Sequence, residues 1–293
     1  EIEAGRGGLA AQAAVVRAQQ ANGEVAPARV YMDQVISENA DGEAETGLLF
    51  LNAALMAVEG DNRGAQEVYR GILNETPEAE IVWRALVATV LRENAENAAE
   101  TAAQILDEAL SHIPDSATLL WMKASLSEQA GDVDGAIAIY EKMYENNSSS
   151  SVVSNNLASL ITTHRTDEES LQRAYVIARR LRGTDLPAFQ DTYGWIAYRM
   201  GNFIEAEENL SAAAAGLPTD PLVQYHLAKA LVAMDRTDEA TEQFGRALEI
   251  WGDAAVPQAT DARAELERLA RASAPQPATP VAQPAATPSQ PSE

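Results

Sequence analysis

The side chains able to act as acids, bases or metal ligands are few or widely scattered. The histidines, His112, His164 and His226, stand far apart, and none shows the short spacing that places two imidazoles on one metal ion. We interpret each as a packing or turn residue. The chain holds no cysteine, which excludes disulfides, thiolate nucleophiles and cysteine metal sites. The sequence therefore predicts no metal site and no cofactor.

Carboxylates are abundant, but none is recognisably placed for catalysis. Adjacent acids such as Glu207 and Glu208 are typical of a solvated helix face, whereas acid–base catalysis needs carboxylates in a pocket that shifts their pKa values. The nucleophile motif G-x-S-x-G is absent. We therefore expect no enzymatic activity in this chain. One alternative stays open, in which the chain is the C-terminal part of a larger enzyme whose catalytic domain lies upstream.

Composition narrows the class of partner. The 293 residues carry 44 acidic and 21 basic side chains, and the formal net charge of −23 opposes binding to nucleic acid and to anionic membranes. No apolar run approaches the ~20 residues that a membrane-spanning helix needs. We expect a protein or peptide partner, no nucleic acid, and no insertion of this chain into a membrane. The oligomeric state stays open.

Two adjacent stretches of 34 residues, 187–220 and 221–254, share one plan. The first predicts two short helices joined by a tight turn at Gly201 and Asn202, because glycine tolerates the dihedrals that end a helix. Pro218 ends the second helix, since proline cannot continue one. One such pair cannot bury its apolar face alone, so neighbouring pairs must stack on it.

This period and its residue pattern resemble the tetratricopeptide repeat. The residues that carry the resemblance are small, apolar or turn-forming ones at set places: Gly194, Gly201, Ala206, Ala213 and Pro218 in the first stretch, and Leu227, Ala228, Ala240, Phe244 and Ala247 in the second. Asp235 replaces the turn glycine of the second stretch. The resemblance implies an all-α fold, a right-handed α-solenoid of helix pairs, and a non-catalytic scaffold that binds peptides or protein surfaces.

The same plan, followed along the chain, predicts about seven helix pairs between a short lead-in and a tail. The expected units are 9–45, 46–79, 80–116, 117–150, 151–186, 187–220 and 221–254. Residues 1–8 are expected to be flexible, and the apolar stripe in 255–272 predicts a helix that caps the solenoid. The tail, 273–293, is rich in proline and alanine and predicts disorder, either as a spacer or as a ligand for a proline-reading domain.

Three short sequence stretches carry a second resemblance, to a narrower group of proteins. The stretches 155–160, 191–202 and 225–231 are similar to the C-terminal repeats of bacterial tetratricopeptide lipoproteins of the PEP-CTERM type, which are linked to exopolysaccharide and cell-surface export. This resemblance implies the bacterial periplasm or cell envelope, and the cytoplasm stays open as an alternative. The chain itself has no cysteine that could carry a lipid.

In the tetratricopeptide family, set positions on each first helix line a concave groove. At these positions basic residues outnumber acidic ones here, although the chain is acidic overall. The resemblance implies partner binding by aromatic, basic and amide side chains of this groove: Trp121, Asn155, Trp195, Tyr198, Arg199, Tyr225 and Lys229. Asn155 resembles an asparagine of chaperone-binding carboxylate clamps, but the lysines of that clamp are missing.

The groove between 187 and 233 is expected to bind an extended segment that carries a carboxylate and an apolar anchor. Arg199 would pair with the carboxylate through two hydrogen bonds, and Lys229 would act as a point charge. Trp195 and Tyr225 would hold the anchor. Two alternatives stay open: Trp195 and Tyr198 pack between units, or the chain is a structural subunit that assembles through its outer faces or its ends.

Overall fold

The structure, a computed structural model, describes residues 14–16, 18–19, 22–38 and 45–273. The described residues are mainly helical and contain no strand. The expected lead-in 1–8 and all but the first residue of the expected tail 273–293 lie outside the described residues. Contacts divide the chain into two compact units, residues 1–165 and 166–293, and each is described by itself.

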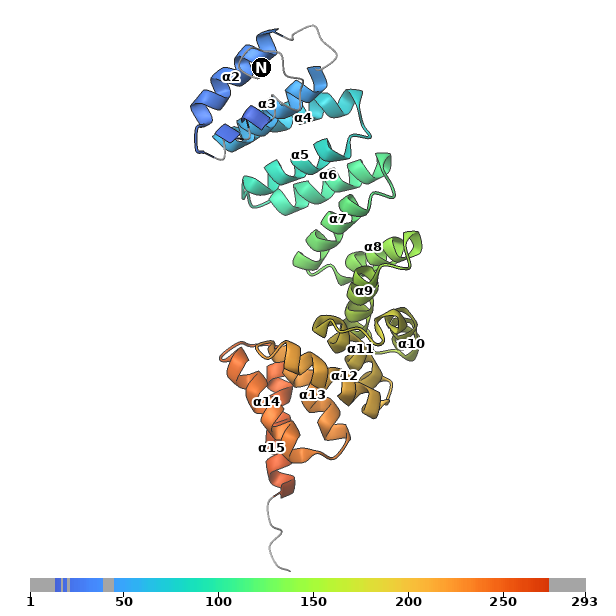
Figure 1. The fold of residues 1–293 in the computed structure, drawn as a ribbon. Helices are drawn as coiled ribbons and strands as arrows, with labels where there is room; N and C mark the ends of the chain where they lie inside the picture. Colours follow the sequence, from blue (N-terminus) through green and yellow to red (C-terminus); the bar gives the residue numbers. More distant parts are fainter. Residues whose placement is uncertain (1–13, 17, 20–21, 39–44, 274–293) are drawn as a thin grey trace, which may run out of the picture. The chain divides into compact units, whose positions relative to one another are not determined.

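The first unit is a succession of helices in which each packs against the next along the chain (Figure 1). Its described helices are α2 (Val25–Glu38), α3 (Glu45–Glu59), α4 (Asn62–Glu75), α5 (Glu80–Arg92), α6 (Ala98–His112), α7 (Ala117–Gln129), α8 (Val133–Asn146) and α9 (Ser151–His164). Short connections force neighbouring helices into antiparallel pairs, which is the arrangement expected for stacked helix hairpins.

The second unit repeats this plan. Its helices are α10 (Glu168–Ala178), the 3-10 turn η1 (Arg179–Leu181), α11 (Pro187–Arg199), α12 (Phe203–Gly216), α13 (Pro221–Ala233), α14 (Thr237–Trp251) and α15 (Pro257–Ser273). Besides sequence neighbours, α11 contacts α13 and α13 contacts α15. Helices α11, α13 and α15 therefore lie next to one another in a row, called the α11–α13–α15 row. The expected repeat 151–186 is divided, because α9 belongs to one unit and α10 to the other.

Glycine and aspartate shape the turns inside the helix pairs. Gly60 and Gly201 adopt positive φ values of 94° and 80°, a region that glycine enters without steric penalty. Asp235 takes the same place between α13 and α14, with a φ of 58°. An aspartate thus stands where the other two turns have a glycine. Asp61 then caps α4, because its carboxylate accepts a hydrogen bond from the Gly64 amide at 2.9 Å.

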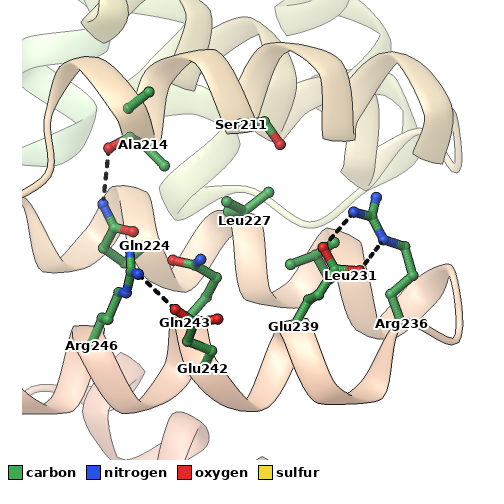
Figure 2. A pocket seen from close by; sticks show the side chains of 11 residues that line it. Ser211, Ala214, Gln224, Leu227, Leu231, Arg236, Glu239, Glu242, Gln243 and Arg246 are labelled. Carbon is green, nitrogen blue, oxygen red and sulfur yellow. Dashed lines mark hydrogen bonds and ion pairs between the residues drawn. The ribbon is translucent and has the colours of Figure 1, made fainter.

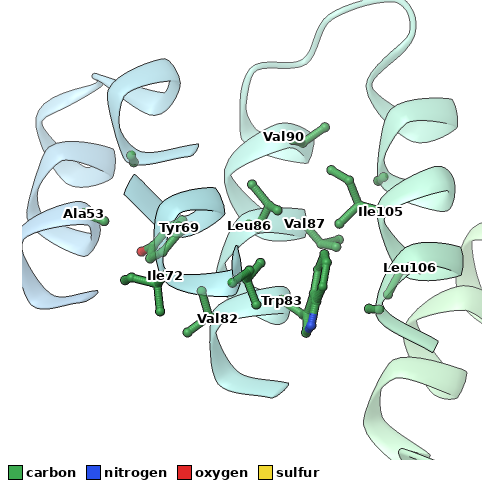
Figure 3. Close-up of a cluster of buried hydrophobic side chains, with 14 of the residues drawn as sticks. Ala53, Tyr69, Ile72, Val82, Trp83, Leu86, Val87, Val90, Ile105 and Leu106 are labelled. Atoms are coloured by element: carbon green, nitrogen blue, oxygen red, sulfur yellow. The ribbon is translucent and has the colours of Figure 1, made fainter. Parts of the chain in front are cut away.

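The core of the first unit is built around Trp83 on α5 (Figure 3). Its ring is 1% exposed and packs with apolar side chains of α4, α5 and α6. The indole Nε1 donates a hydrogen bond to the Pro77 carbonyl at 2.8 Å, and the ring stacks on His112 with centroids 6.0 Å apart. The indole thus fills the space between helices while its polar atom stays satisfied.

Small residues allow α11 and α12 to pack closely in the second unit. A Cβ added at Gly194 would lie 2.8 Å from Cγ of Leu210, so no larger residue fits without a shift. Ala206, Leu210 and Ala213 are fully buried on the facing side of α12. The small residues therefore allow α11 and α12 to approach closely, and this contact fixes where α11 presents its other face.

Candidate binding site on the α11–α13–α15 row

The structure brings five of the seven expected groove residues together. Trp195, Tyr198 and Arg199 lie on α11, and Tyr225 and Lys229 lie on the neighbouring helix α13. The other two, Trp121 and Asn155, belong to the first unit. The candidate site is therefore built within the second unit.

Trp121 and Asn155 lie in one packed network of the first unit. Trp121 meets Tyr140 edge-on, with centroids 5.3 Å apart. Asn155 donates to Oδ1 of Asn156 at 3.2 Å, and Asn156 donates to the Tyr140 hydroxyl at 3.1 Å. Tyr140 in turn donates to the Glu128 carboxylate at 2.7 Å, and burial together with this bond raises the pKa of Tyr140 to about 12. Both residues thus share contacts that position Tyr140.

Trp195 is the centre of an aromatic stack. Its ring is nearly parallel to Tyr198, one turn later on α11, with centroids 4.9 Å apart, and to His226 on α13 at 4.1 Å. Trp195 and Tyr198 remain partly exposed, whereas Tyr225 and His226 are buried, each 7% exposed. The stack therefore joins α11 to α13 and still offers ring surface to a ligand.

A carboxylate holds the histidine of this stack. Nδ1 of His226 lies 2.9 Å from Oδ1 and 3.1 Å from Oδ2 of Asp191. His226 is thus a packing residue, fixed by a ring on one side and an acid on the other. The pair was missed in the sequence because its members stand 35 residues apart, one repeat plus one position.

Lys229 is held by two acids of α15. Its Nζ donates to Oδ2 of Asp261 at 3.0 Å and to Oε1 of Glu265 at 2.9 Å. The Tyr225 hydroxyl also donates to Oδ2 of Asp261, at 2.7 Å. Lys229 therefore completes an internal ion-pair network, and a role as point charge for a ligand requires these contacts to open.

The pKa values in this network follow from the contacts. Burial acts to lower the pKa of Lys229, but hydrogen bonds to Glu265 and Asp261 outweigh it and raise that pKa. Burial acts to raise the pKa of both acids, yet the hydrogen bonds from Tyr225 and Lys229 to Asp261, and from Lys229 and Arg268 to Glu265, leave each pKa below its usual value. The network is therefore strongest in its fully charged form.

A signal for the acids of α15 was present in the sequence. The helices α11, α13 and α15 each begin with a proline, at Pro187, Pro221 and Pro257. Counted from these prolines, Asp261 takes the same place as Tyr225 on α13, so α15 reads as the first helix of a further repeat. The 255–272 stripe, which includes Asp261, was interpreted only as a cap, and no pairing of its acids with Lys229 was predicted.

Arg199 is the last of the five expected groove residues in the second unit. It is partly exposed and lies one helical turn after Trp195, on the same face of α11.

The part of the chain that the structure describes holds no group of three metal-ligating side chains. Among its helices, none combines the length and the apolar character needed to cross a bilayer. The arrangement of rings and charges suits binding.

A family comparison decides what these helix pairs are. Residues 197–256, from the end of α11 through α14, match the family model of the tetratricopeptide repeat. The chain carries tetratricopeptide repeats. Its tetratricopeptide fold is typical of scaffolds for protein–protein interaction. No curated protein matches the sequence.

Solved structures share the fold at low sequence identity. The tetratricopeptide protein YrrB, described as having an unusual peptide-binding site, is 16% identical with a TM-score of 0.50, covering 68% of this chain and 99% of its own. Naa15/Naa10 bound to HypK-THB gives 16% identity and a TM-score of 0.50, covering 89% and 39%. A tetratricopeptide protein from Parabacteroides merdae gives 14% and 0.47, covering 89% and 98%. The narrower resemblance to PEP-CTERM lipoproteins is not confirmed.

Proposed function

We propose that this chain is a non-catalytic scaffold whose second unit holds an extended peptide segment of a partner protein along the α11–α13–α15 row. One observation carries the proposal: the partly exposed Trp195 and Tyr198 rings share a face of α11 with Arg199. Aromatic and arginine side chains are the usual anchors of protein interfaces. The stack with His226 and the Asp191 contact hold these rings in place before any partner arrives, which lowers the entropy lost on binding.

The partner segment is expected to combine an apolar side chain with a carboxylate. The apolar group would cover the exposed parts of Trp195 and Tyr198, and the carboxylate would pair with the Arg199 guanidinium. We assign no ligand contact to Lys229, because Asp261 and Glu265 already balance its charge.

The proposal is tested by selecting peptides from a random library against the full chain and measuring their affinity by calorimetry. Selected peptides should share an acidic residue near an apolar one. Arg199→Glu should weaken them by at least ~30-fold, because it replaces the attraction between guanidinium and carboxylate by like-charge repulsion, a change worth about 2 kcal/mol or more. Arg63→Glu, the same charge change at an exposed site of the first unit, should leave affinity unchanged. Equal affinity for the Arg199→Glu variant and the parent would exclude this site.

We further propose that the scaffold works in the bacterial periplasm or cell envelope, in export to the cell surface. The support is the likeness of 155–160, 191–202 and 225–231 to export-associated repeat proteins. Fractionation of cells expressing the full natural gene with a C-terminal tag checks this directly. Recovery in the cytoplasmic fraction alone would contradict the assignment and leave the binding proposal untouched.

A further inference from the structure

The end of α15 and the candidate site lie at the same end of the second unit. Because short turns make consecutive helices antiparallel, α11, α13 and α15 run parallel to one another. Counted from the prolines that begin these helices, Arg199 is level with Leu269 of α15. The hydrogen bond between Tyr225 and Asp261, which share one place in this count, agrees with it. The chain therefore leaves α15 at Ser273, about one turn beyond the level of Arg199.

A partly exposed apolar surface joins this end of α15 to the candidate site. Trp195 and Tyr198 of α11 and Val232 of α13 are all partly exposed, and all three pack against the core of the second unit. Tyr198 and Val232 hold the same place in their helices, and α11 contacts α13. A segment that leaves α15 thus meets apolar side chains as it crosses α13 towards the rings of α11.

The sequence that follows α15 matches the ligand expected for this site. Residues 274–293 lie outside the described part of the chain, and their sequence holds six prolines, no aromatic residue and one charged side chain, Glu293. Pro288 and Pro291 have the spacing P-x-x-P, and Glu293 follows two residues later. Apolar rings and a carboxylate therefore stand close together in 288–293, which is the combination that the proposed function requires.

Proline suits partly exposed aromatic rings. Segments with the P-x-x-P spacing bind aromatic-lined grooves as polyproline II helices, and they lose little entropy because proline already fixes its φ. That helix rises by about 3.1 Å per residue, which places Pro291 and Glu293 about 6 Å apart. Trp195 and Arg199, one helical turn apart, are separated by about 6 Å along α11. A proline on the rings and a carboxylate at the guanidinium are therefore compatible.

The segment is long enough to reach this surface within one molecule. Packed helices lie about 8–10 Å apart, so α11 is about 20 Å from α15 across the row. The 15 residues from Ser273 to Pro288 span up to about 50 Å when extended. A ligand on such a tether is present at an effective concentration in the millimolar range, so even a weak contact is populated.

We propose that residues 288–293 of this chain bind to its own helix α11. The prolines cover the Trp195 and Tyr198 rings. The Glu293 carboxylate pairs with the Arg199 guanidinium. This inference rests on the proposed function, because it takes the same surface to be a peptide site. The segment is then an internal ligand, and a partner peptide binds only by displacing it.

The lack of cysteine in the chain allows a single spin label to be placed in the segment. Ala286→Cys, two residues before Pro288, carries a nitroxide, and the indole N–H signals of the isotope-labelled full chain are followed by NMR. The nitroxide should broaden the Trp195 signal until it is lost. The signal of Trp83, in the core of the first unit, should stay sharp.

Charge reversal assigns the effect to the ion pair. Arg199→Glu and Glu293→Arg should each restore a sharp Trp195 signal, because like charges then face each other. The two changes together should broaden the signal again, since the charges are opposite but exchanged. Arg63→Glu, at an exposed site of the first unit, should leave the broadening as in the parent.

Peptides selected against the full chain separate this inference from the proposed function. They should bind the Glu293→Arg variant about 10-fold more tightly than the parent, because a tethered competitor is removed. Equal affinity for both chains, with Arg199→Glu still weakening the peptides, would exclude the internal ligand and leave the proposed function standing. Broadening of Trp195 in a chain that binds no selected peptide would support the internal ligand and exclude the proposed function.

Three results of the NMR experiment would overturn the inference. The first is a sharp Trp195 signal in the spin-labelled parent. The second is broadening that survives both single charge reversals, which would mean that the segment passes near α11 without binding to it. The third is equal broadening when spin-labelled chains are mixed with isotope-labelled chains that carry no nitroxide, which would place the segment on a second copy of the chain.

Discussion

Two glycines of the second unit are required for different physical reasons. Gly194 needs space, because an added Cβ would lie 2.8 Å from Cγ of Leu210. Gly201 has open space around it, but its φ of 80° is a conformation that residues with a Cβ rarely adopt. One glycine thus sets the distance between α11 and α12, and the other sets the turn that joins them.

This difference predicts two distinct responses to alanine. Gly194→Ala should destabilise the second unit by about 1–3 kcal/mol through overpacking, and Gly201→Ala by about 1–2 kcal/mol through backbone strain. In a double-mutant cycle measured by urea unfolding, Leu210→Ala should relieve the Gly194→Ala penalty and leave the Gly201→Ala penalty unchanged. Additive effects in both cycles would mean that the contact between α11 and α12 is not what Gly194 serves.

At the scale of elements, α15 is held to α13 by charge as well as by apolar packing. Ala262 and Leu269 of α15 are buried in the core of the second unit. Alongside them, Asp261 and Glu265 engage Lys229. The helix that ends the described chain is therefore fastened by a network whose strength depends on two ionised carboxylates.

That network predicts a loss of stability in acid. The pKa values of Asp261 and Glu265 are lowered by folding, so their contribution is complete above the usual carboxylate pKa and is lost as pH falls through the lowered values. The stability of the second unit, followed by hydrogen exchange of α13, α14 and α15, should fall between about pH 5 and pH 2. Lys229→Met should flatten this dependence.

The control for this measurement is Arg246→Met. It removes an exposed pair with Glu242, in which both side chains are more than half exposed, and such pairs contribute little. The acid dependence of the second unit should then match that of the parent. An equally flattened curve in both variants would show that the acid response comes from overall charge rather than from α15.

The elements show how far the sequence could predict this site. Helix pairs, the turn at Gly201 and the close approach at Gly194 follow from local spacing, because each depends on neighbouring residues along the chain. The partners of Lys229 depend on how α13 and α15 are rotated against each other, which spacing within one helix does not specify. The cavity of about 290 Å³ between α12, α13 and α14 (Figure 2) could not be predicted either, since it depends on how three helices meet.

At the scale of the whole molecule, each unit has its own apolar core. The cluster around Trp83 extends from Ala53 to Leu119 within the first unit. The cluster around Phe244 extends from Ala197 to Leu269 within the second. The sequence pattern predicted a series of repeats, and contacts divide the chain into two compact units at residue 165, inside the expected repeat 151–186.

Separate cores predict that a core substitution destabilises only the unit that contains it. Trp83→Ala removes a fully buried indole and should destabilise the first unit by about 3–5 kcal/mol. Phe244→Ala, at a site with 0% exposure, should do the same in the second. Hydrogen exchange measured by mass spectrometry on the full chain should show faster exchange of α5 and α6 in the first variant, and of α13 and α14 in the second. Because repeat proteins gain stability from nearest neighbours, the effect should fade with distance along the helices of the same unit. Faster exchange of all helices in both variants would show that the two cores unfold as one.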